Sequence, residues 1–156
     1  MFRKSFVPLN SATCAVGFAC LSVWIGFSYP AHANANEARL VVVVDVSEQH
    51  MTVFRDGEKR YNWKVSTARR GKITPRGRWK AKWLSRHHRS SRYNGAPMPY
   101  SIFYNGNFAV HGTNQVKRLG RPASAGCVRL HPENAAVLFN LTKNFGLENT
   151  VVTVVD

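Results

Sequence analysis

The chain has 156 residues, enough for about one domain, and it is strongly basic. Lysine and arginine number 22 against 8 acidic residues, which gives a net charge of +14 with neutral histidines. Such a protein is attracted to anionic polymers, namely cell wall, lipid headgroups or nucleic acid, although the same charge can simply maintain solubility. The sequence shows no repeat, linker, Gly-rich phosphate loop or zinc-ligand spacing, which argues against a multidomain, nucleotide-binding or zinc protein.

The first 35 residues have the pattern of a secretory signal peptide. Arg3 and Lys4 precede an apolar run over residues 12–27, and small-x-small cleavage motifs end at Ala33 and Ala35. A retained membrane anchor is the weaker interpretation, because the run is shorter than the roughly 20 residues of a membrane span. A lipoprotein signal is weaker still, because no aliphatic residue stands three positions before either early cysteine.

Cleavage would leave one domain over residues 36–156, with 20 basic and 8 acidic residues and a net charge near +12. Because Cys14 and Cys20 lie in the signal segment, Cys127 would be the one thiol of the mature chain. A lone cysteine in an exported protein indicates intermolecular pairing or a reactive thiol. We expect an exported protein that is attracted to an anionic surface such as cell wall or lipid headgroups, with no nucleic-acid partner and no membrane span after cleavage.

The first half of this domain is predicted to be strands joined by turns. Asp56-Gly57 is a hairpin signal, and residues 71–77 form a loop rich in turn residues. The segment ending at Leu84 alternates polar with apolar residues, as a strand with one covered face does. In chain order the predicted strands are residues 39–46, 51–54, 59–66 and 78–84.

The second half adds a loop, more strands and one helix. Residues 85–99 are basic and contain Gly and Pro, which predicts a long surface loop, and His87-His88 is interpreted as part of it rather than as a metal site. The predicted strands are residues 100–104, 108–111 and 150–155, and the predicted helix opens at His131-Pro132-Glu133 and ends at Phe145-Gly146. Together these elements predict a small, mainly β fold, a sandwich or barrel-like arrangement with one packed helix and with Trp63, Trp79 and Trp83 in its core.

Cys127 and His111 are the best candidates for chemistry. Gly126 lets the backbone before the thiol approach a ligand closely, and free N–H groups there can hold an oxyanion. His111 ends an apolar strand 16 residues before Cys127, so the two must meet across the fold. Such pairing would lower the thiol pKa from about 8.5 toward neutrality, and the downstream helix would add to this if its N-terminus points at Cys127. Alone, each residue is more readily a buried structural thiol or a core histidine.

These residues resemble a known signature. His111-Gly112-Thr113, followed after the 16-residue gap by Ser124-x-Gly126-Cys127-x-Arg129, is similar to the L,D-transpeptidase (YkuD-type) family. Nearly the whole mature chain follows the family's order of short upstream motifs: Gln49 to Gly57, Val65-Ser66-Thr67, Thr74-Pro75-x-Gly77 and Met98-Pro99-Tyr100. The spaced His-Gly and Ser-x-Gly-Cys-x-Arg blocks are the specific part of this resemblance.

The resemblance implies a cysteine acyltransferase that requires no metal or organic cofactor. Cys127 would attack a peptidoglycan tetrapeptide stem, release D-Ala through a thioester and form a new amide link, and carbapenems would acylate the same thiol. His111 would be the base, with its second ring nitrogen held by the carbonyl of Gly112. Left open are the acyl acceptor, whether a second stem, an anchored protein, a D-amino acid or water, and two alternatives: an L,D-carboxypeptidase, or a non-catalytic wall-binding module.

The remaining expected roles concern binding. N–H groups near Gly126 would stabilise the oxyanion, Arg129 would anchor a substrate carboxylate or shape the pocket, Ser124 would fix the loop by hydrogen bonding, and Tyr100 would line the cleft. From its own surroundings, Arg129 can equally be a structural ion-pair partner. The family often has a histidine two residues before the cysteine, where this chain has Ala125; this difference concerns the oxyanion site more than the nucleophile.

Overall fold

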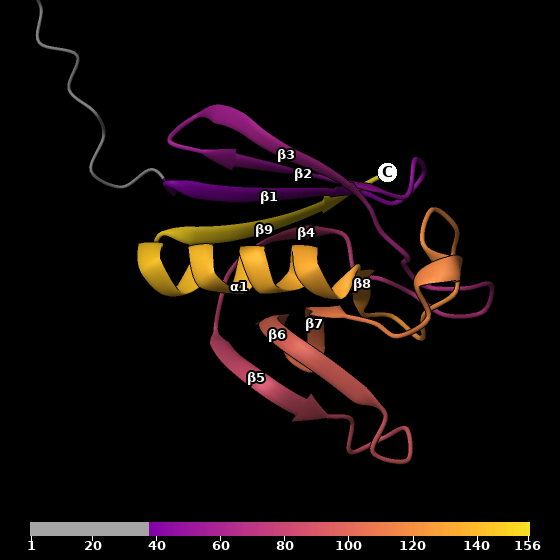
Figure 1. Ribbon diagram of the computed structural model, residues 1–156. Helices are drawn as coiled ribbons and strands as arrows, with labels where there is room; N and C mark the ends of the chain where they lie inside the picture. Colours follow the sequence, from indigo (N-terminus) through magenta and orange to yellow (C-terminus); the bar gives the residue numbers. More distant parts are fainter. Residues whose placement is uncertain (1–37) are drawn as a thin grey trace, which may run out of the picture. The chain divides into compact units, whose positions relative to one another are not determined.

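The structure, a computed structural model, describes residues 38–156. The predicted signal peptide, residues 1–35, lies outside the described residues. The described part is mainly β, with two sheets and one α-helix (Figure 1), which confirms the predicted fold class. No helix among residues 38–156 is both long and apolar enough to cross a membrane.

The first sheet has five strands in the order β3-β2-β1-β9-β4. Its central strand β1 pairs antiparallel with β2 and parallel with β9, and its alternate residues Leu40, Val42 and Val44 are fully buried. The predicted hairpin joins β2 to β3 through Asp56 and Gly57, whose φ angles of 49° and 81° suit a two-residue turn. The strand bounds are β1 Leu40–Asp45, β2 His50–Arg55, β3 Glu58–Lys64, β4 Gly77–Lys80 and β9 Thr150–Val155.

The second sheet has four strands in the order β5-β6-β7-β8. Its pairs are antiparallel except for β7 and β8, which run parallel because the chain makes a long excursion between them. The strand bounds are β5 Trp83–Arg89, β6 Pro97–Asn105, β7 Phe108–Gly112 and β8 Val128–Leu130. This parallel pair carries the candidate site.

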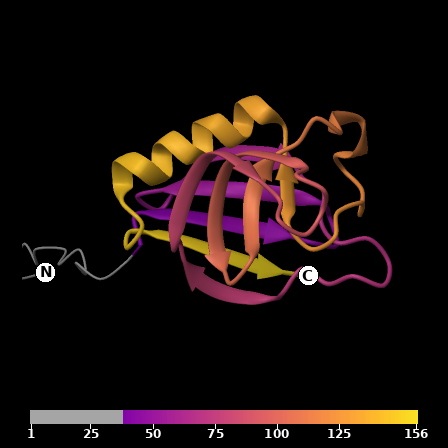
Figure 2. The same cartoon turned by 90° about the horizontal axis from the view of Figure 1, so that it is seen from below.

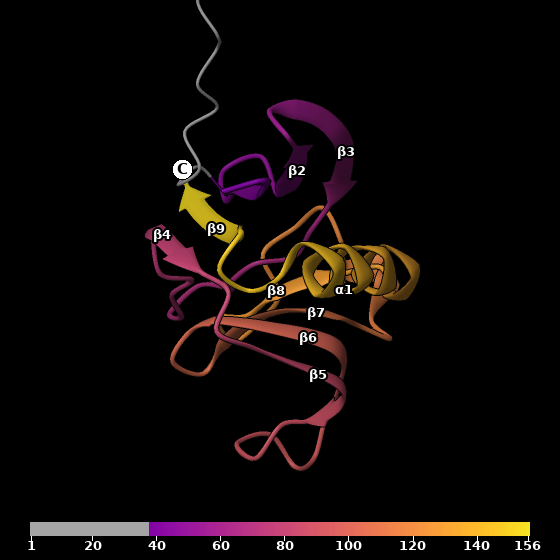
Figure 3. The ribbon, with the colours of Figure 1, turned by 90° about the vertical axis from the view of Figure 1, so that its left-hand side faces the viewer.

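The helix α1, Pro132–Phe145, has the predicted limits, with Gly146 (φ 87°) as its C-cap. It buries Ala135, Leu138, Phe139 and Thr142. In Figures 2 and 3 it runs along one side of the space between the two sheets. The main apolar core is formed by the inner faces of both sheets together with this helix.

Two sequence predictions in the middle of the chain were wrong. The predicted strand 78–84 is divided between two sheets, because the chain crosses over at Ala81, whose N–H bonds Thr150, and Lys82, whose N–H bonds Phe103. The predicted loop 85–99 is largely the hairpin of β5 and β6, and only residues 90–96 connect these strands. Charged residues are frequent on exposed edge strands, so the composition of β5 resembles that of a loop.

The positions of the histidines and tryptophans in this region also differ in part from the prediction. His88 lies on β5 and packs edge-on against Trp83 and Phe103, so it does not belong to a solvated loop. Trp83 stacks on Phe103 at 3.7 Å between ring centroids and remains 43% exposed, so its prediction as a core residue was wrong. Trp63 and Trp79 are half-buried and pack against the core, as predicted.

Candidate active site

The register of β7 and β8 places His111 and Cys127 on one face of the second sheet. Val110 pairs with Val128, and both side chains are buried in the main core. Because side chains alternate along a strand, the residues on either side of these valines project to the opposite, outer face. Cys127 packs there in a small cluster with Ala109, two residues before His111 on the same strand. Arg129 pairs directly with His111.

The imidazole of His111 is buried and has a defined tautomer. Its side chain is 5% exposed, and Nδ1 lies 2.7 Å from the carbonyl oxygen of Gly112. Since a carbonyl only accepts, Nδ1 must carry the proton, which leaves Nε2 with a free lone pair. Burial lowers the pKa of His111 from 6.5 to about 4, against the opposing effect of the Gly112 hydrogen bond. The imidazole is therefore neutral at pH 7, as a proton acceptor must be.

The thiol of Cys127 is also neutral in this resting state. Burial raises its pKa above the ordinary value of 9.0, although the main chain of Ala109 and the charge of Arg129 both favour the thiolate. The expected lowering of the thiol pKa is not found, because desolvation by burial is the largest effect and His111 is not among the groups that act on the thiol. The sulfur is half-buried, and its Sγ lies 3.8 Å from the carbonyl oxygen of Asn107.

The segment before the thiol is held by hydrogen bonds of Ser124 and Gly126. The N–H of Gly126 donates to Ser124 Oγ at 2.9 Å, so this N–H is engaged and not free for an oxyanion. Gly126 has φ of 140°, and a Cβ there would lie 2.6 Å from the Phe108 ring and 2.9 Å from the carbonyl oxygen of Ile73. Only glycine fits this position.

Sequence reasoning did not single out Thr74 and Gln49, which support this segment. Thr74 Oγ1 donates to the carbonyl oxygen of Gly126 at 2.8 Å and accepts from the N–H of Ala68 at 3.0 Å. The buried Gln49 side chain bonds both the main chain and the hydroxyl of Thr67. Both residues stand in the upstream motifs that carry the family resemblance, but nothing in their spacing connects them with Cys127.

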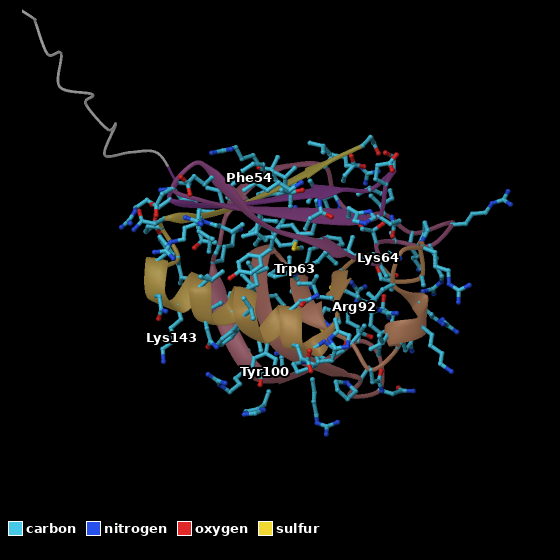
Figure 4. All side chains as sticks on the ribbon, turned by 45° about the horizontal axis from the view of Figure 1, so that its top comes forward. Phe54, Trp63, Lys64, Arg92, Tyr100 and Lys143 are labelled. Atoms are coloured by element: carbon cyan, nitrogen blue, oxygen red, sulfur yellow. The ribbon has the colours of Figure 1, made fainter. Side chains whose placement is uncertain are left out.

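Arg129 and Tyr100 take different positions relative to the thiol. Arg129 is half-buried, which lowers its pKa, and it donates to Gln115 Oε1 at 3.0 Å. Within residues 38–156 it has no carboxylate partner within 4 Å. Tyr100 instead lies beside α1 (Figure 4), where its ring meets Phe139 at 5.8 Å. It packs against the main core, so the structure does not group it with Cys127.

The helix N-terminus lies near His111 rather than near the thiol. A Cβ on Gly112 would be 3.2 Å from the Cα of Pro132, the first residue of α1. Strand β8 separates this helix end from Cys127. The contribution of the helix dipole to the thiolate, considered from the sequence, therefore stays a prediction.

A cavity of about 370 Å³ lies between the loop after β3 and the C-terminus. Thr74 is on its wall, whereas Cys127 and His111 are not. Its lining consists of Val46, Ala68, Lys72, Ile73, Thr74, Arg76 and Asp156. Nowhere in the described part of the chain do three His, Cys, Asp or Glu side chains gather to hold a metal ion.

Exposed basic residues form a surface near the site, which we call the basic platform: Arg69, Arg70, Lys72, Lys117, Arg118 and Arg121. They come from two loops that Figures 1 and 2 show at the same end of the molecule. Hydrogen bonds from Arg69 N–H to the Ser124 carbonyl and from Ser66 Oγ to the Arg121 carbonyl join these loops. The lysine and arginine ion pairs of residues 38–156 involve other bases: Arg39, Arg55, Arg60, Arg76 and Lys80.

Comparison with known proteins finds a matching family model and several similar solved structures. The family model described as YkuD, L,D-transpeptidase catalytic domain, matches residues 39–154. An L,D-transpeptidase from Stackebrandtia nassauensis has 26% identity and a TM-score of 0.67, and covers 81% of this chain and 61% of its own. An L,D-transpeptidase from Mycobacterium smegmatis has 23% identity and a TM-score of 0.68, with 76% and 59% covered.

A third solved structure, LD transpeptidase LdtMt1 in complex with imipenem, has 24% identity and a TM-score of 0.67, with 75% of this chain and 59% of that chain covered. The chain thus spans about 60% of the length of these structures. Among curated proteins, none matches the chain.

Proposed function

The chain belongs to the L,D-transpeptidase catalytic domain family, and from this membership we propose that it is a peptidoglycan L,D-transpeptidase with Cys127 as nucleophile. The observation that carries the proposal is the β7–β8 register, which puts Cys127 and the neutral imidazole of His111 on the same outer face. A buried structural thiol would not need a histidine whose tautomer leaves Nε2 free.

The proposed reaction has two steps of acyl transfer. Cys127 Sγ attacks the carbonyl of the third residue of a tetrapeptide stem while its proton passes to His111 Nε2. The tetrahedral intermediate collapses, the bond to the terminal D-Ala nitrogen breaks, and His111 returns the proton to that amine. An acceptor amine then attacks the thioester, the C–S bond breaks, and the sulfur recovers its proton through His111.

Because both partners start neutral, proton transfer must accompany the attack of sulfur on the carbonyl. A base whose pKa is about 4 does not ionise a thiol whose pKa is raised above 9.0 before substrate binds. As sulfur attacks, the proton on His111 is stabilised by the Gly112 carbonyl at Nδ1. This couples formation of the nucleophile to the presence of an acyl group and protects the resting thiol from side reactions.

Arg129 is the proposed anchor for a substrate carboxylate. Arg129 pairs with His111 in the strand register, and its half-buried guanidinium has an amide oxygen, that of Gln115, as its side-chain partner. A cation partly removed from water is best stabilised by an anion, and a guanidinium binds a carboxylate through two parallel hydrogen bonds. Tetrapeptide stems carry several carboxylates, which fits this arrangement.

The remaining parts of the proposal concern location. We infer export to the periplasm through the signal peptide at residues 1–35, and association of the basic platform with anionic cell-wall material. Acylation of Cys127 by carbapenems belongs to the same proposal, and the solved LdtMt1 structure with imipenem supports testing it.

The test uses purified protein and tetrapeptide muropeptides, with product masses read after chromatography. We expect release of D-Ala and a cross-linked dimer from the unaltered protein, together with a covalent carbapenem adduct in its intact mass. Cys127→Ala should lose all three, because the residue that carries the acyl group is gone.

Two other outcomes would contradict the proposal, and each would support one of the alternative functions. Release of D-Ala without any dimer on addition of acceptor stem would make the protein an L,D-carboxypeptidase. If the folded protein with its cysteine intact gives no D-Ala release and no adduct, it would be a wall-binding module. Thermal melting of Cys127→Ala serves as the control for folding.

A further inference from the structure

The hydroxyl of Thr74 holds the carbonyl that immediately precedes the nucleophile. Thr74 is 1% exposed, and its Oγ1 donates to the Gly126 carbonyl oxygen while accepting from the N–H of Ala68. The hydroxyl thus acts both as a donor and as an acceptor, and these two hydrogen bonds determine its direction. A buried hydroxyl bound in this way keeps one orientation.

This hydrogen bond also determines where the N–H of Cys127 points. The Gly126 carbonyl and the Cys127 N–H belong to one planar peptide unit, and the described residues contain no cis peptide bond. In a trans peptide the C=O and N–H point in opposite directions. Because Gly126 lacks a Cβ and has φ of 140°, its own backbone preferences do little to select this orientation.

Among the main-chain donors beside the sulfur, the N–H of Gly126 is already occupied by Ser124 Oγ. The N–H of Cys127 belongs to the nucleophile itself, so it lies close to any carbonyl that the sulfur attacks. An N–H aimed in advance at the developing oxyanion is among the largest contributions to acyl-transfer catalysis.

Resting on the acyl-transfer function proposed above, we propose that Thr74 is a positioning residue that aims the Cys127 N–H at the oxyanion. Ser124 complements it by engaging the N–H of Gly126. Thr74 touches neither the substrate nor the sulfur in this proposal. It acts through the 126–127 peptide.

The first test compares Thr74→Val, which keeps the shape but loses the hydroxyl, with Thr74→Ser, which keeps the hydroxyl. We expect kcat for acyl transfer to fall about 100-fold in T74V with KM nearly unchanged, and to recover to within about tenfold in T74S. Alkylation of Cys127 by uncharged iodoacetamide should change little in T74V, because this reaction develops no oxyanion.

Thr150→Val is the matched control. Thr150 is also fully buried, and its Oγ1 donates to a glycine carbonyl, that of Gly146, at 2.9 Å but far along the chain from the thiol. T150V should therefore lose stability without the selective loss of kcat. An active T74V with unchanged kcat, or a T74V whose alkylation slows as much as its acyl transfer, would overturn the inference.

A measurement on the unaltered protein covers the case in which T74V does not fold. On acylation by a carbapenem, the amide proton of Cys127 should move downfield in the NMR spectrum as it bonds the acyl oxygen, while that of Gly126 stays near its place. A shift at Gly126 in place of Cys127 would overturn the role of Thr74. Absence of any adduct would instead refute the acyl-transfer function itself.

Discussion

Burial favours the neutral form of both side chains that are proposed to react, His111 and Cys127. His111 is nearly inaccessible to solvent, and its pKa of about 4 is a consequence of that burial. Cys127, packed beside Ala109, has its pKa displaced upward for the same reason. In the proposed mechanism, such a pair reacts only when a substrate carbonyl is present to take up the developing negative charge.

The pH dependence of stability should reveal the buried imidazole. An unfolded histidine binds a proton below pH 6.5, whereas folded His111 binds one only below about pH 4. The folded protein therefore has its full stability, as far as His111 is concerned, above pH 6.5. As the pH falls from 6.5 to about 4, the free energy of unfolding drops by roughly 3 kcal/mol, at about 1.4 kcal/mol per pKa unit.

Urea unfolding of the unaltered protein and His111→Gln at pH 7 and pH 4 checks this value. The stability advantage of the unaltered protein over H111Q should shrink by roughly 3 kcal/mol toward the acidic end. Parallel pH curves for the two proteins would mean that the imidazole titrates normally in the folded state.

At the scale of elements, α1 is held by one face only. Its buried residues Ala135, Leu138, Phe139 and Thr142 recur at helical spacing, and Val137 points to solvent with 38% exposure. The helix follows β8 after a single residue, so its packing also fixes the end of the strand that carries Arg129. Loosening the helix should therefore affect the site indirectly.

Leu138→Ala should lower the free energy of unfolding by about 2–5 kcal/mol, because the side chain is fully buried in the main core. Val137→Ala is the matched control on the same helix and should change stability by less than about 0.5 kcal/mol. Chemical denaturation of both variants measures the difference. Equal losses in the two variants would mean that α1 is not anchored through Leu138.

At the scale of the whole molecule, charge is unevenly distributed. The ion pairs of residues 38–156 engage bases such as Arg39, Arg55 and Lys80, whereas the six residues of the basic platform have no such pair. Arg69 and Arg118 are close enough to Arg129 to help lower its pKa, so the platform adjoins the site. An anionic partner bound there would lie near the thiol.

Retention on cell-wall pellets should therefore depend on salt and on the platform. Replacing Lys117, Arg118 and Arg121 with Glu should release the protein at clearly lower salt, because screening competes with fewer attractive charges. The matched control replaces three exposed lysines elsewhere with Glu: Lys59, Lys82 and Lys143. Equal elution of the two triple variants would mean that net charge alone, rather than the platform, governs retention.

Local patterns in the sequence were sufficient to predict most of the strands and the helix. Asp56-Gly57 predicted a hairpin because both residues tolerate positive φ, and His131-Pro132 with Gly146 predicted both ends of α1. The spaced motifs around His111 and Cys127 also identified the family, because they depend on the order of residues along the chain.

Other features depended on contacts between distant segments, and only the tertiary structure decided them. Strand β5 is basic in composition, and its pairing with β6 makes it a strand. Burial, which no local pattern contains, reversed the expected pKa direction of Cys127. Thr74 and Gly126 are 52 residues apart, and folding alone brings that hydroxyl to that carbonyl. Local propensity therefore determined the elements, and non-local packing determined the chemistry of the site.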